Sequence, residues 1–280
     1  MPFKRHRGGA RALEFNGLKT TQSGAQEARA RRSSDVRRLA RGRGAEINFN
    51  TSARRRRGVR ILQVGDLHGS VRAAEKAGEK ARNTDSQVVI VVGDITNFGT
   101  LGEAEKLLRL IKERSGTPVL FVAGNCDPPE LLTHAPADDK IINVHSKSFN
   151  LGGYDFMGVG GSRETPHRGT WIEMSETEFS QIVSSLSQLA SQKWILLTHN
   201  PPSGVEAARS SSGLDLGSPS IRAWIERAKP LVVCCGHVHE ARSISFVSGV
   251  PVVNAGPARD GNCALIELTE NKALPRLERL

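Results

Sequence analysis

Seven side chains of types that bind metal ions follow short apolar runs of this sequence. They occur in five motifs, G-D-L-H-G, G-D, G-N-C-D, T-H-N and G-H-V-H. The side chains are Asp66, His68, Asp94, Asn125, His199, His237 and His239. Each motif alone has an ordinary explanation, because an Asp after a strand commonly caps a helix and a strand-terminal His commonly fills its hydrogen bonds locally. Because such side chains follow several successive apolar runs, the five motifs together indicate a single site.

The donor set of these motifs is a mixture of carboxylate and amide oxygens with imidazole nitrogens. Such a mixture suits two divalent ions of Mn, Fe, Zn or Ni, and the sequence does not choose among them; we expect manganese to be a suitable metal for assays. Two ions about 3.5–4 Å apart can share a hydroxide, neutralise phosphoryl oxygens and orient an ester for in-line attack. The predicted reaction is therefore the hydrolysis of a phosphoester by a metal-bridging hydroxide.

The first half of the site is positioned by alternating strands and helices. Strands are predicted over residues 59–64, 87–92 and 118–123, with helices over 71–82 and 101–114. Asp66, Asp94 and Asn125 each follow one of these strands, at separations of 28 and 31 residues, about one βαβ unit each. Successive parallel strands bring such residues to the same sheet edge, where open α/β sheets bind ligands.

The second half of the chain is less regular. Strands are predicted over 140–144, 148–151, 154–159, 194–198 and 231–235, and helices over 176–191 and 218–228. Residues 160–174 and 201–214 are predicted loops, and residues 243–247, 251–254 and 263–268 a predicted antiparallel meander. Together these elements predict two sheets packed face to face with helices outside.

In this order the five motifs resemble the calcineurin-like metallophosphoesterase superfamily. The segments V-G-G-S-R-E-T-P, T-H-N-P-P-S-G, C-G-H-V-H-E-A-R and N-A-G-P-A-R-D-G resemble an archaeal and prokaryotic branch related to cyclic-nucleotide phosphodiesterases. The resemblance implies an α/β fold, a four-layer α/β/β/α sandwich of two mixed β-sheets flanked by helices. It also implies that Asp66, His68 and His239 bind the first metal, that Asn125, His199 and His237 bind the second, and that Asp94 bridges them.

One position departs from the commonest pattern of that superfamily. Many members have G-N-H-[DE], where the histidine contacts the phosphate and can protonate the leaving group, whereas this chain has Cys126. A thiol with a pKa near 8.5 is a poor proton donor. His167, in the loop after Gly160, is a candidate substitute, and Arg163 and Arg168 in that loop are candidates for phosphate binding. Each of these loop residues could equally be an ordinary surface side chain. Asp127 is expected either to orient the site or to cap the following turn.

The net charge of +10 is concentrated at the N-terminus. Residues 1–57 contain 16 Lys and Arg against 4 Asp and Glu, whereas residues 58–280 contain 23 against 25. The basic segment has few apolar residues and is expected to be a disordered extension of a domain at 58–280. It could be an organellar transit peptide, an arm that contacts nucleic-acid phosphates, or a dispensable extension.

These observations predict an enzyme that acts on small phosphodiesters such as cyclic nucleotides, because the domain lacks excess positive charge and the general-acid histidine. The alternatives are a nuclease that uses the basic tail and a scaffold that keeps the fold without the reaction. No apolar run is long enough to span a bilayer, and the four cysteines form no disulfide framework or zinc spacing. We therefore expect a cytoplasmic protein that does not bind membranes; its oligomeric state is not predicted.

Overall fold

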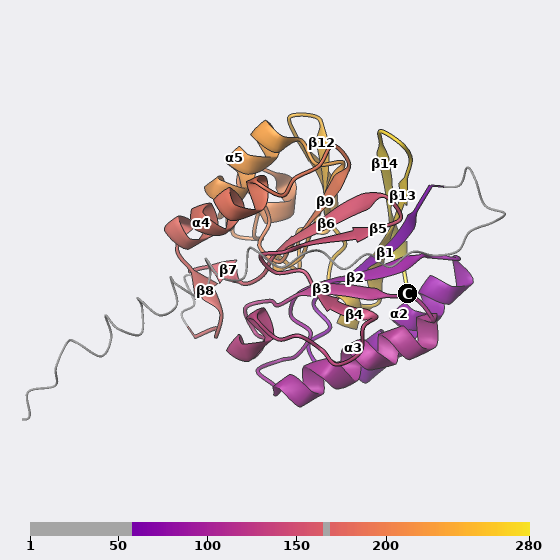
Figure 1. The fold of residues 1–280 in the computed structure, drawn as a ribbon. Helices are drawn as coiled ribbons and strands as arrows, with labels where there is room; N and C mark the ends of the chain where they lie inside the picture. Colours follow the sequence, from indigo (N-terminus) through magenta and orange to yellow (C-terminus); the bar gives the residue numbers. More distant parts are fainter. Residues whose placement is uncertain (1–57, 165–168) are drawn as a thin grey trace, which may run out of the picture. The chain divides into compact units, whose positions relative to one another are not determined.

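A computed structural model of the chain describes residues 58–164 and 169–280. The predicted basic extension at 1–57 lies outside these residues, as do His167 and Arg168. In the described part of the chain, two six-stranded sheets are packed face to face and each carries helices on its outer face (Figure 1). The predicted four-layer α/β/β/α sandwich is confirmed.

The first sheet has the strand order β14-β13-β1-β2-β3-β4. Its strands are β1 (Arg60–Val64), β2 (Val88–Val92), β3 (Val119–Val122), β4 (Ile141–Asn143), β13 (Asn262–Leu268) and β14 (Ala273–Arg279). The strands from β1 to β4 are parallel, whereas β13 pairs antiparallel with both β1 and β14. The predicted βαβ units are therefore present, and they carry the loops after β1, β2 and β3 to one edge.

The second sheet has the strand order β11-β12-β10-β9-β6-β5. Its strands are β5 (Ser148–Leu151), β6 (Tyr154–Val159), β9 (Trp194–Thr198), β10 (Val232–Cys235), β11 (Ser243–Val247) and β12 (Val250–Asn254). The four inner strands are parallel to one another, and β5 and β11 pair antiparallel at the two edges. Both sheets are thus mixed.

Three buried clusters fill the spaces between the layers. Between the sheets, β1, β2 and β3 contribute one face of apolar residues that packs against β9, β10 and β12. The other face of the first sheet packs on α2 (Val71–Asn83) and α3 (Leu101–Ser115), and that of the second packs on α4 (Glu176–Ser187) and α5 (Pro219–Ala228). Because β2 is buried on both faces, its sequence Val-Val-Ile-Val-Val is apolar without alternation. These helices are too short or too polar to cross a membrane, as are all others in the described residues.

The predicted meander over residues 243–268 is wrong. β11 and β12 form a hairpin in the second sheet, but β13 crosses to the first sheet and pairs with β1. The physical reason is that β13 is apolar on both sides. Cys263 and Leu265 pack toward α2 and α3, while Ala264 and Ile266 pack between the sheets. A strand with two apolar faces must lie where a helix layer covers one face and the other sheet covers the second.

Two further boundaries differ from the prediction. The segment predicted as a loop over 160–174 contains two paired two-residue strands, β7 (Ser162–Arg163) and β8 (Glu173–Met174). Helix α4 ends at Ser187, one turn before the predicted residue 191. The capping box of Ser175 and Glu178 fixes its start, whereas the serine-rich end offers no glycine to mark where it stops.

Candidate metal centre

The seven predicted ligands follow strands of both sheets, where the two sheets' carboxyl ends meet. Asp66, Asp94 and Asn125 lie in the loops after β1, β2 and β3, and His199 follows β9. His237 and His239 lie in the loop after β10, and His68 follows Asp66. Backbone hydrogen bonds connect neighbouring loops, from Asp66 N–H to Gly93 O (3.0 Å) and from Gly236 N–H to His199 O (3.1 Å). The structure therefore brings the side chains together.

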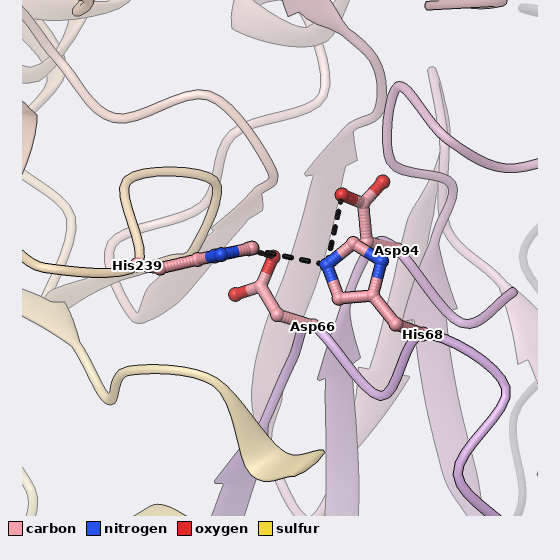
Figure 2. A group of neighbouring side chains, drawn as sticks. All are labelled: Asp66, His68, Asp94 and His239. Atoms are coloured by element: carbon pink, nitrogen blue, oxygen red, sulfur yellow. Dashed lines mark hydrogen bonds and ion pairs between the residues drawn. The ribbon is translucent and has the colours of Figure 1, made fainter. Parts of the chain in front are cut away.

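Asp66, His68 and His239, which we call the first ligand group, lie close together beside Asp94 (Figure 2). Together with Asp94, each of them offers a ligand atom within 4.8 Å of the others. His68 Nε2 lies 3.1 Å from His239 Nε2, and His239 Nε2 lies 3.4 Å from Asp66 Oδ1. Nδ1 of His68 is buried and has no hydrogen-bond partner among the described residues.

Asn125, His199 and His237, which we call the second ligand group, meet at the side-chain oxygen of Asn125. Asn125 Oδ1 lies 2.8 Å from His199 Nε2 and 2.9 Å from His237 Nδ1. The other ring nitrogen of His199 lies 2.8 Å from the Val92 carbonyl oxygen. His199 is fully buried. Three donor atoms therefore converge in an orientation that the backbone of β2 helps to fix.

Asp94 stands between the two groups. Its Oδ2 lies 3.6 Å from His68 Nε2, and its Oδ1 lies 3.5 Å from His199 Nε2. Oδ1 also accepts the backbone N–H of Cys126 at 2.8 Å. One carboxylate thus presents a different oxygen to each ligand group, which is the arrangement that a bridging ligand needs.

Four of the seven residues have a left-handed backbone. The φ angles are +52° at Asp66, +44° at His68, +47° at Asp94 and +71° at His237. This region costs a non-glycine residue roughly 1–2 kcal/mol, and such strain gathers at functional sites. At these residues the turn directs the side chain toward the other ligands. A continuing strand would direct it elsewhere.

Two glycines let the loops approach closely enough for these contacts. A Cβ at Gly93, where φ is +88°, would lie 2.4 Å from His199 Nδ1. A Cβ at Gly124 would lie 2.2 Å from Asp94 Oδ1. Both positions therefore exclude any side chain, which explains the glycines that recur in the motifs.

Burial favours the neutral, metal-binding form of His68 and His237, whereas the contact with Asp66 favours the protonated form of His239, which metal binding must deprotonate. Burial lowers the pKa of His237 to about 3 and also lowers the pKa of His68, so both rings are neutral at physiological pH. Burial opposes ionisation of Asp66, but the hydrogen bond with His239 and the nearby imidazoles bring its pKa below the usual value. That same hydrogen bond raises the pKa of His239. Neutral imidazoles and ionised carboxylates are the forms that bind cations.

Asp127 orients the loops that carry the ligands Asp94 and Asn125. Its carboxylate is fully buried and accepts the backbone N–H groups of Gly124 (2.8 Å), Ile95 (3.1 Å) and Thr96 (2.7 Å). It thereby ties the Asp94 loop to the Asn125 loop. Burial and the charge of Asp94 raise the pKa of Asp127 to about 6. Of the two predicted roles, the structure supports the orienting one.

Cys126 lies beside Asp94 and is nearly buried. Its Sγ is 3.6 Å from the side-chain nitrogen of Asn125. Burial and the charge of Asp94 raise the pKa of the thiol well above its usual range. The group that replaces the superfamily's histidine therefore stays a neutral thiol.

Of the predicted phosphate-binding residues in the loop after Gly160, only Arg163 is described. Its guanidinium pairs with Glu176 (3.2 Å) and donates to the Gly217 carbonyl (2.7 Å), so binding a phosphate would require it to leave these partners. Sequence reasoning missed Arg259, whose guanidinium lies 3.3 Å from His239 Nδ1. The segment N-A-G-P-A-R-D-G contains Arg259 and was the signal that could have found it.

The donors present fit a pair of divalent cations. Asp66 and Asp94 are buried carboxylates, and in the described residues they form ion pairs only with histidines. Buried carboxylates need a compensating cation, and neutral imidazoles cannot provide one. Two imidazole nitrogens that face one another at 3.1 Å, as in His68 and His239, also suit a shared cation.

Comparisons with known proteins identify the family of the chain and agree with its fold. The model of the calcineurin-like phosphoesterase family matches residues 59–241. The uncharacterized protein MJ1162 of Methanocaldococcus jannaschii is 30% identical over 204 residues, covering 71% of this chain and 88% of that protein. The structure of TT1561 of Thermus thermophilus superposes with a TM-score of 0.64 at 21% identity, covering 78% of this chain and 98% of the other. A dimetal phosphatase from Danio rerio superposes with a TM-score of 0.55 at 13% identity, covering 80% and 96%.

Proposed function

Because the chain belongs to the calcineurin-like phosphoesterase family, we propose that it hydrolyses small phosphodiesters with the help of two divalent metal ions. The first ligand group would hold one ion, the second ligand group the other, and Asp94 would bridge them. When bound, such ions activate water and neutralise the phosphoryl oxygens. The observation that carries the proposal is the position of Asp94, whose two oxygens lie 3.6 Å and 3.5 Å from a histidine of each group.

The chain's own residues would orient the substrate's phosphate. Arg259 presents a guanidinium at the rim of the first ligand group, where it can donate to a phosphoryl oxygen. His199 is held by the Val92 carbonyl and Asn125 by its two histidine contacts, so neither ring nor amide needs to reorganise. This fixed arrangement supports catalysis by positioning.

The preference for diesters rests on Cys126. Hydrolysis adds water at phosphorus and breaks a P–O bond, and the departing alcohol must take up a proton. A neutral thiol whose pKa is raised by burial donates that proton poorly. Esters with weakly basic leaving groups, such as aryl diesters, depend least on such a donor.

A scaffold without activity is the rival from another class. Members that lose catalysis would be expected to lack ligands, whereas here all seven side chains lie in the two groups and at Asp94. The nuclease alternative depends on the basic extension, which lies outside the described residues.

The test is metal analysis of the full chain together with a substrate panel in Mn²⁺. We expect two metals per chain, rapid hydrolysis of bis(p-nitrophenyl) phosphate and slow hydrolysis of alkyl monophosphates. Asp138→Asn, a change at a half-buried ion pair with Lys112 away from the metal centre, serves as the matched control. A chain that binds two metals but hydrolyses none of the panel would favour the scaffold.

A further inference from the structure

Two large aromatic side chains are exposed near the metal centre. Phe98 is 42% exposed and Trp171 is 47% exposed, and their rings form an edge-to-face pair with centroids 5.2 Å apart. Large aromatic side chains are usually buried, and an exposed pair therefore marks a binding surface more often than a single exposed residue does.

Both residues are attached to the loop that carries Asn125. The N–H of Phe98 donates to the Cys126 carbonyl at 2.9 Å, and the N–H of Trp171 donates to the Asn125 carbonyl at 2.8 Å. Phe98 comes from the loop after β2 and Trp171 from the segment before β8, so two separate segments converge on the same two residues. The pair is thereby fixed next to the second ligand group.

The segment that holds Phe98 is rigid on both sides. Before it, Thr96 donates its N–H to Asp127 at 2.7 Å; after it, Thr100 and Glu103 form the capping box of α3. Phe98 itself has a left-handed backbone, with φ of +57°. This conformation costs a bulky residue free energy, and because the ring of Phe98 stays exposed, burial does not offset the cost. The strain is explained if the ring has a ligand.

We propose that Phe98 and Trp171 bind the base of a nucleotide whose phosphate lies at the metal centre. Every nucleobase has a flat π-face that stacks on aromatic side chains without requiring a particular sequence. Because Phe98 and Trp171 are both more than two-fifths exposed, part of the surface of the pair can contact a third ring. The inference rests on the proposed phosphoesterase function and names its substrate class, nucleoside phosphoesters.

Fluorescence offers the first test, because Trp171 can be observed separately. The chain has three tryptophans. Trp194 and Trp224 are buried, and their ring centroids lie 4.7 Å apart. We expect adenosine 5′-monophosphate to shield the exposed tryptophan from acrylamide quenching in the full chain loaded with Mn²⁺. Ribose 5-phosphate, which lacks the base, should give no such shielding.

Calorimetric titration of variants completes the test. Phe98→Leu/Trp171→Leu should bind adenosine 5′-monophosphate about 10–100-fold more weakly, as expected for loss of base stacking, and ribose 5-phosphate unchanged. Phe246→Leu, at an exposed phenylalanine of β11, should behave as the parent chain. Equal affinity of the parent for the two ligands, or an equal loss of both in the double variant, overturns the inference.

These measurements separate the inference from the proposed function. Both ligands are titrated without turnover, and bis(p-nitrophenyl) phosphate hydrolysis is assayed independently. A chain that hydrolyses the diester but shows no preference for the base contradicts the aromatic site alone. A chain that prefers the base but hydrolyses no phosphoester contradicts the proposed function and leaves base binding supported.

Discussion

A backbone carbonyl orients a histidine of the second ligand group, whereas among the described residues the histidine rings of the first group contact only other side chains. In the second, Asn125 Oδ1 lies 2.8–2.9 Å from two imidazole nitrogens and the Val92 carbonyl orients His199. In the first, two Nε2 atoms face each other at 3.1 Å, and in the part of the chain that the structure describes Nδ1 of His68 has no hydrogen-bond partner. The difference indicates that the backbone of β2 orients a ring of the second group, while the buried carboxylate of the first group needs a cation to balance its charge.

Substitution of Asp94 is expected to have the largest effect on the difference between the two ligand groups, because Asp94 contacts a histidine of each group. Asp94→Asn keeps an acceptor for the Cys126 N–H but removes the charge, and Asp94→Ala removes both. We expect bound metal to fall toward zero and hydrolysis of bis(p-nitrophenyl) phosphate to be abolished in both variants, with the fold retained. Metal content and circular dichroism provide the measurements, and Asp138→Asn is the control.

Retention of two metals per chain with near-normal turnover in Asp94→Asn would contradict the bridging role. Loss of one metal with the other retained would show that the groups bind independently. That result would keep the difference between the two ligand groups but contradict the bridging role of Asp94.

Cys126, next to the second ligand group, allows a test of how the leaving group is protonated. Cys126→His restores a proton donor, and we expect esters with basic leaving groups to gain most, by as much as the roughly 10²–10⁴-fold typical of general acid catalysis. Aryl diesters should gain little, since their leaving groups depart without a proton. The measurement is kcat/KM across a series of leaving-group pKa values.

His167→Ala, run on the same series, tests the rival donor from the loop after Gly160. A selective loss on basic leaving groups in that variant, with no gain in Cys126→His, would assign the proton to the loop. The explanation of the diester preference by Cys126 would then be wrong.

Much of this fold was predictable because its signals are local. The apolar run at 88–92 predicts a strand buried on both faces, and spacings of 28 and 31 residues place Asp66, Asp94 and Asn125 at one sheet edge. The route of β13 was not predictable, because antiparallel pairing with β11 and β12 or with β1 satisfies the same local pattern. Only the packing of both its faces decides between them.

The candidate site shows the same division. Residue types and order place the ligands near one another, but the sequence does not indicate the left-handed backbone at His68 and His237, since only tertiary contacts stabilise it. Phe98 and Trp171 were missed for a related reason. They are 73 residues apart in the chain and meet only because both donate to the backbone at Asn125 and Cys126.

Stability without metal tests the difference between the groups directly. His199→Ala removes a buried ring and leaves the Val92 carbonyl without that partner, so we expect a loss of about 1–3 kcal/mol in unfolding free energy. His68→Ala removes a ring whose buried Nδ1 has no partner, and its effect should stay within about 1 kcal/mol. Urea unfolding in EDTA measures both. Equal losses would show that the first group is as well arranged by the protein as the second.

The pH dependence of stability separates acid sensitivity of the fold from that of the ligands. His145 lies outside both groups, accepts the Gly160 N–H at Nδ1 (2.9 Å), and burial lowers its pKa to about 4. Its ordinary pKa is near 6.5, so between about pH 6.5 and pH 4 the unfolded chain holds a proton that the native chain does not. Stability from this group is therefore complete above pH 6.5 and is lost as the pH falls, by at most about 1.4 kcal/mol per pH unit. His145→Asn keeps an acceptor for Gly160 but does not titrate, so urea unfolding in EDTA should show a shallower pH slope than in the parent chain. An unchanged slope would assign the acid sensitivity to other groups, and the ligand histidines would be the next to examine.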